Sequence, residues 1–295
     1  ELKRIFSKKI NVLAIGVALI LSVIFSGFAV TSNRYVDENG NVSTGVWAVR
    51  KLTDNRRAWR GALTAEKLAN VIAQNKQVMA QSQDEIDADY GKMLQPIDDI
   101  KDFMISVLTP DSEYDDSVLN QMSDENIQNF YGIYQNNMKK MSEEYGHTSF
   151  QKKYLENKYS KIKLPLTYEA YSSWDTMIMY AETYSIVLAI IVGFICAGIF
   201  ADDFQTKADA VFFTAKYGRT KAVKTKIVAG IATTTVVYWS GIALLSIICF
   251  GIMGISGINT PYQVSQAYSI YIMTYGQYYL MTVLCGYIAS LLAAT

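Results

Sequence analysis

The amino-acid sequence predicts an all-α polytopic membrane protein with at least four transmembrane helices, six in the intact chain, and a mainly helical extracellular domain. Only 18% of its 295 residues are charged and 51% are apolar, whereas soluble domains carry about 25% charged residues. Charged side chains are absent from three long runs, 10–30, 184–201 and 227–295. Basic and acidic residues balance at 27 each, which argues against a nucleic-acid partner, since such binders carry a basic excess.

The three uncharged runs predict four membrane spans, because about 20 apolar residues cross a bilayer core of roughly 30 Å. We place these spans at 10–30, 184–201, 227–253 and 273–295, with a polar break dividing the last run. The first run follows four basic residues, as a signal peptide would. It is longer than a signal core and lacks a clean cleavage site, so we interpret it as a retained span.

Charge asymmetry predicts the orientation of these spans, since cytoplasmic flanks are rich in Lys and Arg. Residues 1–9 carry a net charge of +3, residues 202–226 also carry +3, and residues 31–183 carry −6. We therefore expect 1–9 and 202–226 on the cytoplasmic side, and 31–183 and 254–272 outside. No basic residue follows the fourth span, and from this we expect further spans beyond residue 295.

The segment 31–183 reads as helical. Thr64 is a predicted N-cap for a helix that buries Leu68, Ile72 and Met79. Pro96 is suited to begin a helix over 97–108, and Ser123 to cap a third helix. That third helix carries an apolar stripe, which predicts a domain core rather than a ligand groove: Ile127, Phe130, Tyr131, Tyr134, Met138 and Met141.

Aromatic residues cluster where the chain returns to the second span. Amphipathic rings collect at the headgroup level of a bilayer, so we expect an aromatic belt at the outer interface. Recognition of carbohydrate or peptide is the alternative interpretation. The residues of this predicted belt are Tyr168, Tyr171, Trp174, Tyr180 and Tyr184.

Signals for enzymatic or metal chemistry are weak, and we expect no catalytic, cofactor or metal site in this chain. His147 is the single histidine, so neither a zinc site nor a Ser-His-Asp triad can be assembled. The acidic run 111–116 lacks the Gly and Glu of a calcium loop, and we interpret it as a solvated turn. Asn41-Val42-Ser43 fits the degenerate glycosylation sequon. No nucleotide-binding motif is present.

Polar and small residues inside the predicted spans are interpreted as packing groups. The three cysteines, Cys196, Cys249 and Cys285, all fall in spans, which favours packing over disulfides or redox chemistry. The hydroxyls of 233–235 and Ser240 have no acid, base or metal ligand beside them, so we expect helix contacts rather than catalysis. Close packing is also expected at Gly193, Ala197 and Gly198.

The segment 202–226 carries the strongest functional signal. Apolar residues recur there at helical spacing, from Phe204 through Val211 and Phe212, while polar residues occupy the other faces. This pattern predicts a short amphipathic helix on the cytoplasmic membrane surface, with Gly218 as its stop. Lys221, Lys224 and Lys226 would anchor the next span at the headgroups. The helix is either a connector or a docking element for a cytosolic motor.

These residues resemble the corresponding loop of bacterial ABC-2-type ABC transporter permeases. The resemblance extends to Gly61–Thr64, Asn129–Tyr131, Leu164–Trp174, Pro261–Gln263 and Tyr275–Gln277. Members of this family usually have Glu at the position of Asp203. The matching positions are Asp203, Phe204, Thr206, Asp209, Tyr217, Gly218 and Arg219, and Phe212 completes the predicted docking face.

The resemblance implies a multi-pass permease subunit of the bacterial plasma membrane, with a cytoplasmic N-terminus and six spans. It further implies a second permease subunit, identical or different, and cytosolic ABC ATPase subunits that bind ATP-Mg. The expected substrate is an exported amphipathic peptide, antibiotic or lipid. The alternative is a membrane sensor or resistance protein whose extracellular domain binds a peptide or envelope ligand.

Overall fold

A computed structural model describes residues 1–82, 86, 89–110, 114–205, 214 and 218–294. The chain divides into two compact units, each built from separate segments. The apolar-helix unit comprises Glu1–Val30, Thr176–Ile252 and Tyr279–Thr295. The polar unit comprises Thr31–Asp175 and Met253–Tyr278. The polar unit thus holds residues 31–175 of the predicted outer segment 31–183 and all of 254–272, whereas residues 176–183 belong to the apolar-helix unit.

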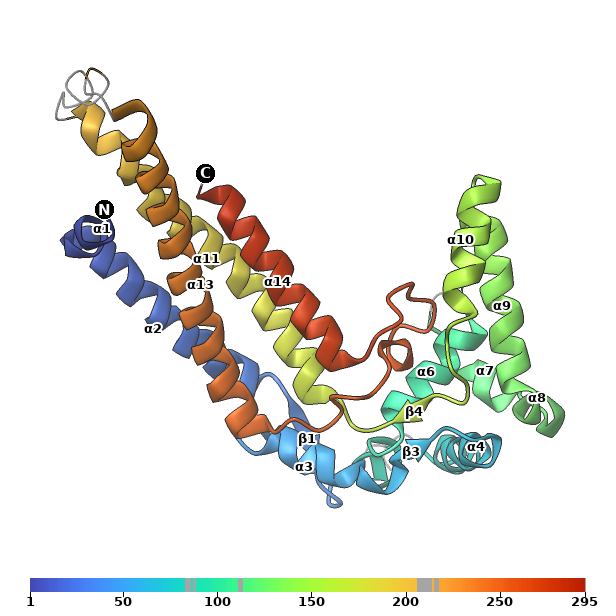
Figure 1. The fold of residues 1–295 in the computed structure, drawn as a ribbon. Helices are drawn as coiled ribbons and strands as arrows, with labels where there is room; N and C mark the ends of the chain where they lie inside the picture. The colour runs from blue at the N-terminus through green and yellow to red at the C-terminus, as the bar shows by residue number, and fades with distance from the viewer. Residues whose placement is uncertain (83–85, 87–88, 111–113, 206–213, 215–217, 295) are drawn as a thin grey trace. The chain divides into compact units, whose positions relative to one another are not determined.

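Four helices of the described chain are long and apolar enough to cross a membrane (Figure 1). They mark this chain as a membrane protein with transmembrane helices, as the sequence predicts. Three of them, α2, α11 and α13, extend beyond the predicted spans, whereas α14 begins and ends within its predicted span 273–295. Their bounds are α2 (Lys9–Thr31), α11 (Ser172–Gln205), α13 (Val223–Met253) and α14 (Tyr275–Ala293); α1 (Leu2–Ser7) precedes them, and a π-helical turn, Gly218–Ala222, precedes α13.

Hydroxyl groups link the four apolar helices. Tyr184 donates to the Ala18 carbonyl at 2.7 Å, which joins α11 to α2. The Ser185 hydroxyl lies 2.9 Å from that of Tyr238, and Tyr238 donates to the Val283 carbonyl at 2.7 Å, which joins α11, α13 and α14. Polar groups in an apolar medium need such partners. Further links are Ser22 to Gly241, Thr235 to Tyr287 and Ser246 to Tyr279.

Glycines allow these helices to approach closely. A Cβ atom at Gly193 would lie 3.2 Å from the Ala293 carbonyl oxygen, which confirms the predicted packing role. A Cβ atom at Gly286 would lie 2.5 Å from the Tyr238 hydroxyl and 2.6 Å from the Ser185 hydroxyl. Ala197, in contrast, is exposed on the surface of the single chain, so its packing role stays a prediction.

The described residues of the polar unit are mainly helical and form two small antiparallel ladders. The first ladder pairs Tyr35 with Ser43, and the second pairs Gly61 with Tyr168. The helices are α3 (Ala48–Asn55), α4 (Ala65–Met79), α6 (Asp98–Leu108), α7 (Ser117–Asn120), α8 (Asp124–Gln128), α9 (Phe130–Tyr145) and α10 (Ser149–Tyr159); the strands are β1 (Arg34–Val36), β2 (Val42–Thr44), β3 (Gly61–Ala62) and β4 (Thr167–Tyr168). Short turns of helix occur at Arg57–Trp59, Tyr90–Leu94 and Tyr262–Val264.

Both predicted caps are present. The Thr64 hydroxyl accepts a hydrogen bond from the Lys67 amide, and the Ser123 hydroxyl accepts one from the Asn126 amide. These bonds satisfy donors that the first helical turn leaves open. The predicted third helix is divided at Asn129 into α8 and α9.

The apolar stripe over α8 and α9 forms part of the core, as predicted. Four of its members are buried: Ile127, Phe130, Tyr134 and Met138. Phe103 from α6 packs edge-on against Phe130 and Tyr134. Met79 is a correction to the sequence prediction, because it is the last residue of α4 and is exposed, while Val78 is fully buried.

Candidate functional site

The predicted docking residues are only partly described. Thr206, Asp209, Phe212 and Tyr217 lie outside the described residues. Asp203 and Phe204 belong to the last turn of α11, which ends at Gln205, and Gly218 and Arg219 begin the π-helical turn before α13. The docking surface therefore remains a sequence prediction.

The five residues of the predicted aromatic belt divide between the two units. Tyr168, Tyr171 and Trp174 are buried in the polar unit, where Trp174 Nε1 donates to the Ile255 carbonyl at 3.1 Å. Tyr180 and Tyr184 lie in the apolar-helix unit, with ring centroids 6.4 and 5.5 Å from that of Phe25. The belt as such remains a prediction.

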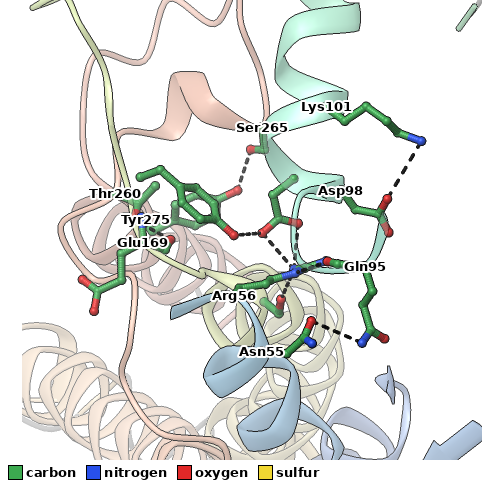
Figure 2. Close-up of polar contacts among 12 residues, drawn as sticks. Asn55, Arg56, Gln95, Asp98, Lys101, Glu169, Thr260, Ser265 and Tyr275 are labelled. Carbon is green, nitrogen blue, oxygen red and sulfur yellow. Dashed lines mark hydrogen bonds and ion pairs between the residues drawn. The ribbon is translucent and has the colours of Figure 1, made fainter. Parts of the chain in front are cut away.

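The polar unit contains a buried ion pair between Arg56 and Asp99, and Figure 2 shows the contacts around Arg56. Arg56 follows α3, and its Nη1 atom lies 2.7 and 2.8 Å from the two carboxylate oxygens of Asp99 in the first turn of α6. The side chains are only 8% and 12% exposed. Arg56 also donates to the Ser172 hydroxyl at 2.9 Å and to the Gln95 carbonyl at 3.2 Å. Tyr168 donates to Asp99 at 2.8 Å.

The protonation states within this cluster follow from burial and from Asp99. Burial alone would lower the pKa of Arg56, but Asp99 and its neighbours outweigh it and raise that pKa, so the guanidinium stays charged. Burial, followed by the charge of Asp99, holds the pKa values of Tyr168 and Tyr171 well above the ordinary range. These phenols are therefore neutral donors at physiological pH.

A second set of polar contacts surrounds the ion pair. The Gln95 carboxamide accepts from the Val36 amide at 2.8 Å and donates to the Val36 carbonyl at 3.0 Å, as an additional strand would. Tyr90 donates to Asp98 at 2.5 Å, and Lys101 lies 3.9 Å from the same carboxylate. Burial raises the pKa of Asp98 despite these partners.

The returning segment 253–278 is tied to the polar unit through Glu169 and Thr260 (Figure 2). The Glu169 amide donates to the Thr260 hydroxyl at 3.2 Å, and that hydroxyl donates to the Glu169 carbonyl at 2.9 Å. Ser256 donates to the Glu169 carboxylate at 3.0 Å. Tyr268 donates to the Val107 carbonyl at 2.7 Å. The network thus joins segments that are far apart in the sequence, which is a structural role.

Tyrosine rings form a continuous row beside this network. Tyr171 stacks on Tyr275 at 4.6 Å, and Tyr262 stacks on Tyr278 at 4.1 Å. An edge-on contact of 5.5 Å joins Tyr275 to Tyr262, and another of 5.9 Å joins Tyr278 to Tyr271. The row ends at a hollow of about 580 Å³.

Sequence reasoning missed this hollow. It is lined by five tyrosines that come from two separate segments of the chain: Tyr114 from one, and Tyr262, Tyr268, Tyr271 and Tyr278 from the other. The only signal for it in the sequence is the abundance of tyrosine, 21 in all.

The apolar-helix unit buries the side chain of Lys226, which the sequence analysis predicts to lie at the lipid headgroups. Lys226 is 1% exposed, and its Nζ atom donates to the Ile199 carbonyl at 2.9 Å. Arg4 donates to the same carbonyl at 3.0 Å. A side chain so buried does not reach out to headgroups, so the prediction of an anchoring role is corrected at Lys226. Lys226 also lines a hollow of about 560 Å³ with Cys196 and Gly230.

Among the residues that the structure describes, no three His, Cys, Asp or Glu side chains gather to hold a metal ion. No protein-family model, curated protein or solved structure matches this chain.

Proposed function

We propose that this chain is the membrane-spanning permease subunit of an ABC exporter. It moves an amphipathic peptide, antibiotic or lipid, using ATP hydrolysed by a separate cytosolic ATPase subunit. Two permease subunits, identical or different, form the path across the bacterial plasma membrane. The ATPase, not this chain, binds ATP-Mg.

The segment 202–226 is the observation that carries this proposal. It joins two of the four apolar helices, it has a net charge of +3, and its sequence resembles the loop that contacts the ATPase in ABC-2-type permeases. Positive charge favours the cytoplasmic side. The amphipathic helix that the sequence predicts there would present Phe204 and Phe212 to a cytosolic partner.

Docking is tested by co-purification of the full chain with its ATPase. Phe204→Asp combined with Phe212→Asp should reduce the amount of ATPase recovered, because charge would disrupt an apolar contact. Phe150→Asp is the matched control, since Phe150 lies on α10 and is 78% exposed. Unchanged recovery for the double variant contradicts the docking role. If the wild-type chain itself recovers no ATPase, a membrane sensor or resistance protein becomes the better description.

The proposed orientation places the N-terminus inside and the polar unit outside. It is tested in a chain whose three cysteines are replaced, with one new cysteine at an exposed position, Phe150→Cys or Ser7→Cys. A membrane-impermeant maleimide should label position 150 in intact cells and position 7 only after lysis. The reverse pattern refutes the orientation.

A further inference from the structure

The tyrosine-lined hollow of the polar unit has the dimensions and chemistry of a ligand site. Its volume of about 580 Å³ falls within the usual range of about 300–1,000 Å³ for small-molecule pockets. Besides the five tyrosines, its walls carry hydroxyl and carboxamide groups from Ser106, Thr109 and Gln266. No described residue that lines it is charged. The walls therefore suit an apolar body with few hydrogen-bonding groups.

The rings remain partly open to a ligand. Tyr114 is 58% exposed and Tyr271 is 46% exposed. The ring of Tyr271 meets that of Tyr278 edge-on, while Tyr278 stacks on Tyr262. Aromatic faces carry negative potential, and several of them around one space attract an organic cation.

Two acidic residues, Asp102 and Asp116, lie close to Tyr114, one of the tyrosines that line the hollow. Tyr114 donates to Asp102 at 2.7 Å. Burial, Asp102 and Asp116 together raise the pKa of the Tyr114 hydroxyl. Lys101 lies 3.5 Å from Asp116 and also approaches Asp98. At Tyr114 the carboxylates of Asp102 and Asp116 outnumber the ammonium group of Lys101, which leaves this end of the hollow negative. Negative potential at a rim draws cations toward a pocket.

We propose that this hollow binds an organic cation with an apolar body, held by the tyrosine faces and attracted by Asp102 and Asp116. The cation is either a small ammonium compound or the side chain of a cationic amphipathic peptide. Tyr278 lies in the first turn of α14, a candidate membrane span.

Binding is measured with the full chain in a maltoside detergent, which carries neither charge nor ammonium group. One arm compares choline with 3,3-dimethylbutan-1-ol, its uncharged carbon isostere. The other compares a lysine-containing amphipathic peptide with the same peptide acetylated on lysine. In at least one arm the cation should bind more tightly than its neutral partner, and that arm identifies the source. Equal binding within both pairs, or no binding of any probe, overturns the proposal.

Variants locate the site. Tyr271→Leu should weaken cation binding by roughly 2- to 30-fold, the range for loss of one cation–π contact, whereas Tyr271→Phe should retain it. Tyr154→Leu is the matched control, because Tyr154 is also 46% exposed but lies on α10 outside the hollow. Asp102→Asn should weaken binding most at low salt. Wild-type affinity in Tyr271→Leu, or equal loss in Tyr154→Leu, overturns the assignment.

The proposal is independent of the ATPase. That the bound cation is also the exported substrate rests on the proposed function, but binding is measured here without ATPase or ATP. A chain that binds the cation and recruits no ATPase would contradict the exporter and leave the site intact. A chain that recruits the ATPase and binds no cation would contradict the cation site and leave the exporter intact.

Discussion

Two adjacent arginines offer a sharp test of how the polar unit is held together. Arg56 and Arg57 are neighbours in the chain and both pair with aspartates. The Arg56 pair with Asp99 is 8% and 12% exposed, whereas the Arg57 pair with Asp54 is 75% and 64% exposed. Replacing each arginine by methionine removes the charge and keeps an unbranched side chain. The two substitutions should differ greatly in how much they lower the stability of the polar unit.

The expected magnitudes follow from burial and from the partners lost. Arg56→Met leaves Asp99 buried, with the Tyr168 hydroxyl as a remaining donor, and removes bonds to Ser172 and Gln95. Removing one partner of a buried ion pair costs about 3–5 kcal/mol. Arg57→Met breaks an exposed pair, which is worth about 0–1 kcal/mol. Since domains are stable by about 5–15 kcal/mol, only the first change should be severe.

The measurement is the urea dependence of proteolysis of the polar unit, with the full chain held in detergent. Arg56→Met should shift cleavage to much lower urea, and Arg57→Met should follow the wild type. Adding Asp99→Leu to Arg56→Met should recover part of the loss, because the uncompensated buried charge is gone. Equal shifts for Arg56→Met and Arg57→Met would refute the reasoning that burial decides the contribution of each pair.

Two further predictions concern a buried acid and a close helix contact. Burial raises the pKa of Asp98 above its ordinary value of 3.8. The charged carboxylate therefore destabilises the folded state at neutral pH. This destabilisation disappears as the pH falls through the pKa of the folded state toward 3.8, the pKa of the unfolded state. Asp98→Asn should therefore stabilise the polar unit most at neutral pH, with the advantage shrinking in acid; a pH-independent difference in urea midpoint would contradict this. Gly286→Ala places a Cβ atom 2.5 Å from the Tyr238 hydroxyl, whereas Gly16→Ala meets nothing within 4 Å, so the first should lower the thermal midpoint in detergent, by a net cost of about 1–2 kcal/mol, and the second should not. Equal midpoints for the two variants would contradict the packing argument.

Local features of this chain could be predicted because they depend on nearby residues. The uncharged runs predict four apolar helices, since a bilayer requires such lengths. The caps at Thr64 and Ser123 follow from side chains that satisfy amides three residues away. The stripe from Ile127 to Met138 follows from helical periodicity. Each of these features is present in the structure.

Tertiary structure alone decided which of two adjacent arginines is buried, because Arg56 meets partners as distant in the chain as Ser172. It also decided that Lys226 donates to the Ile199 carbonyl inside the unit, although its place in a Lys-rich segment before a span predicts contact with lipid headgroups. The tyrosine hollow joins Tyr114 to a segment that begins at Met253 and ends at Tyr278. Hydropathy and capping act over one or two helical turns, whereas the partner of a buried charge and the walls of a hollow come from segments that meet only when the chain folds.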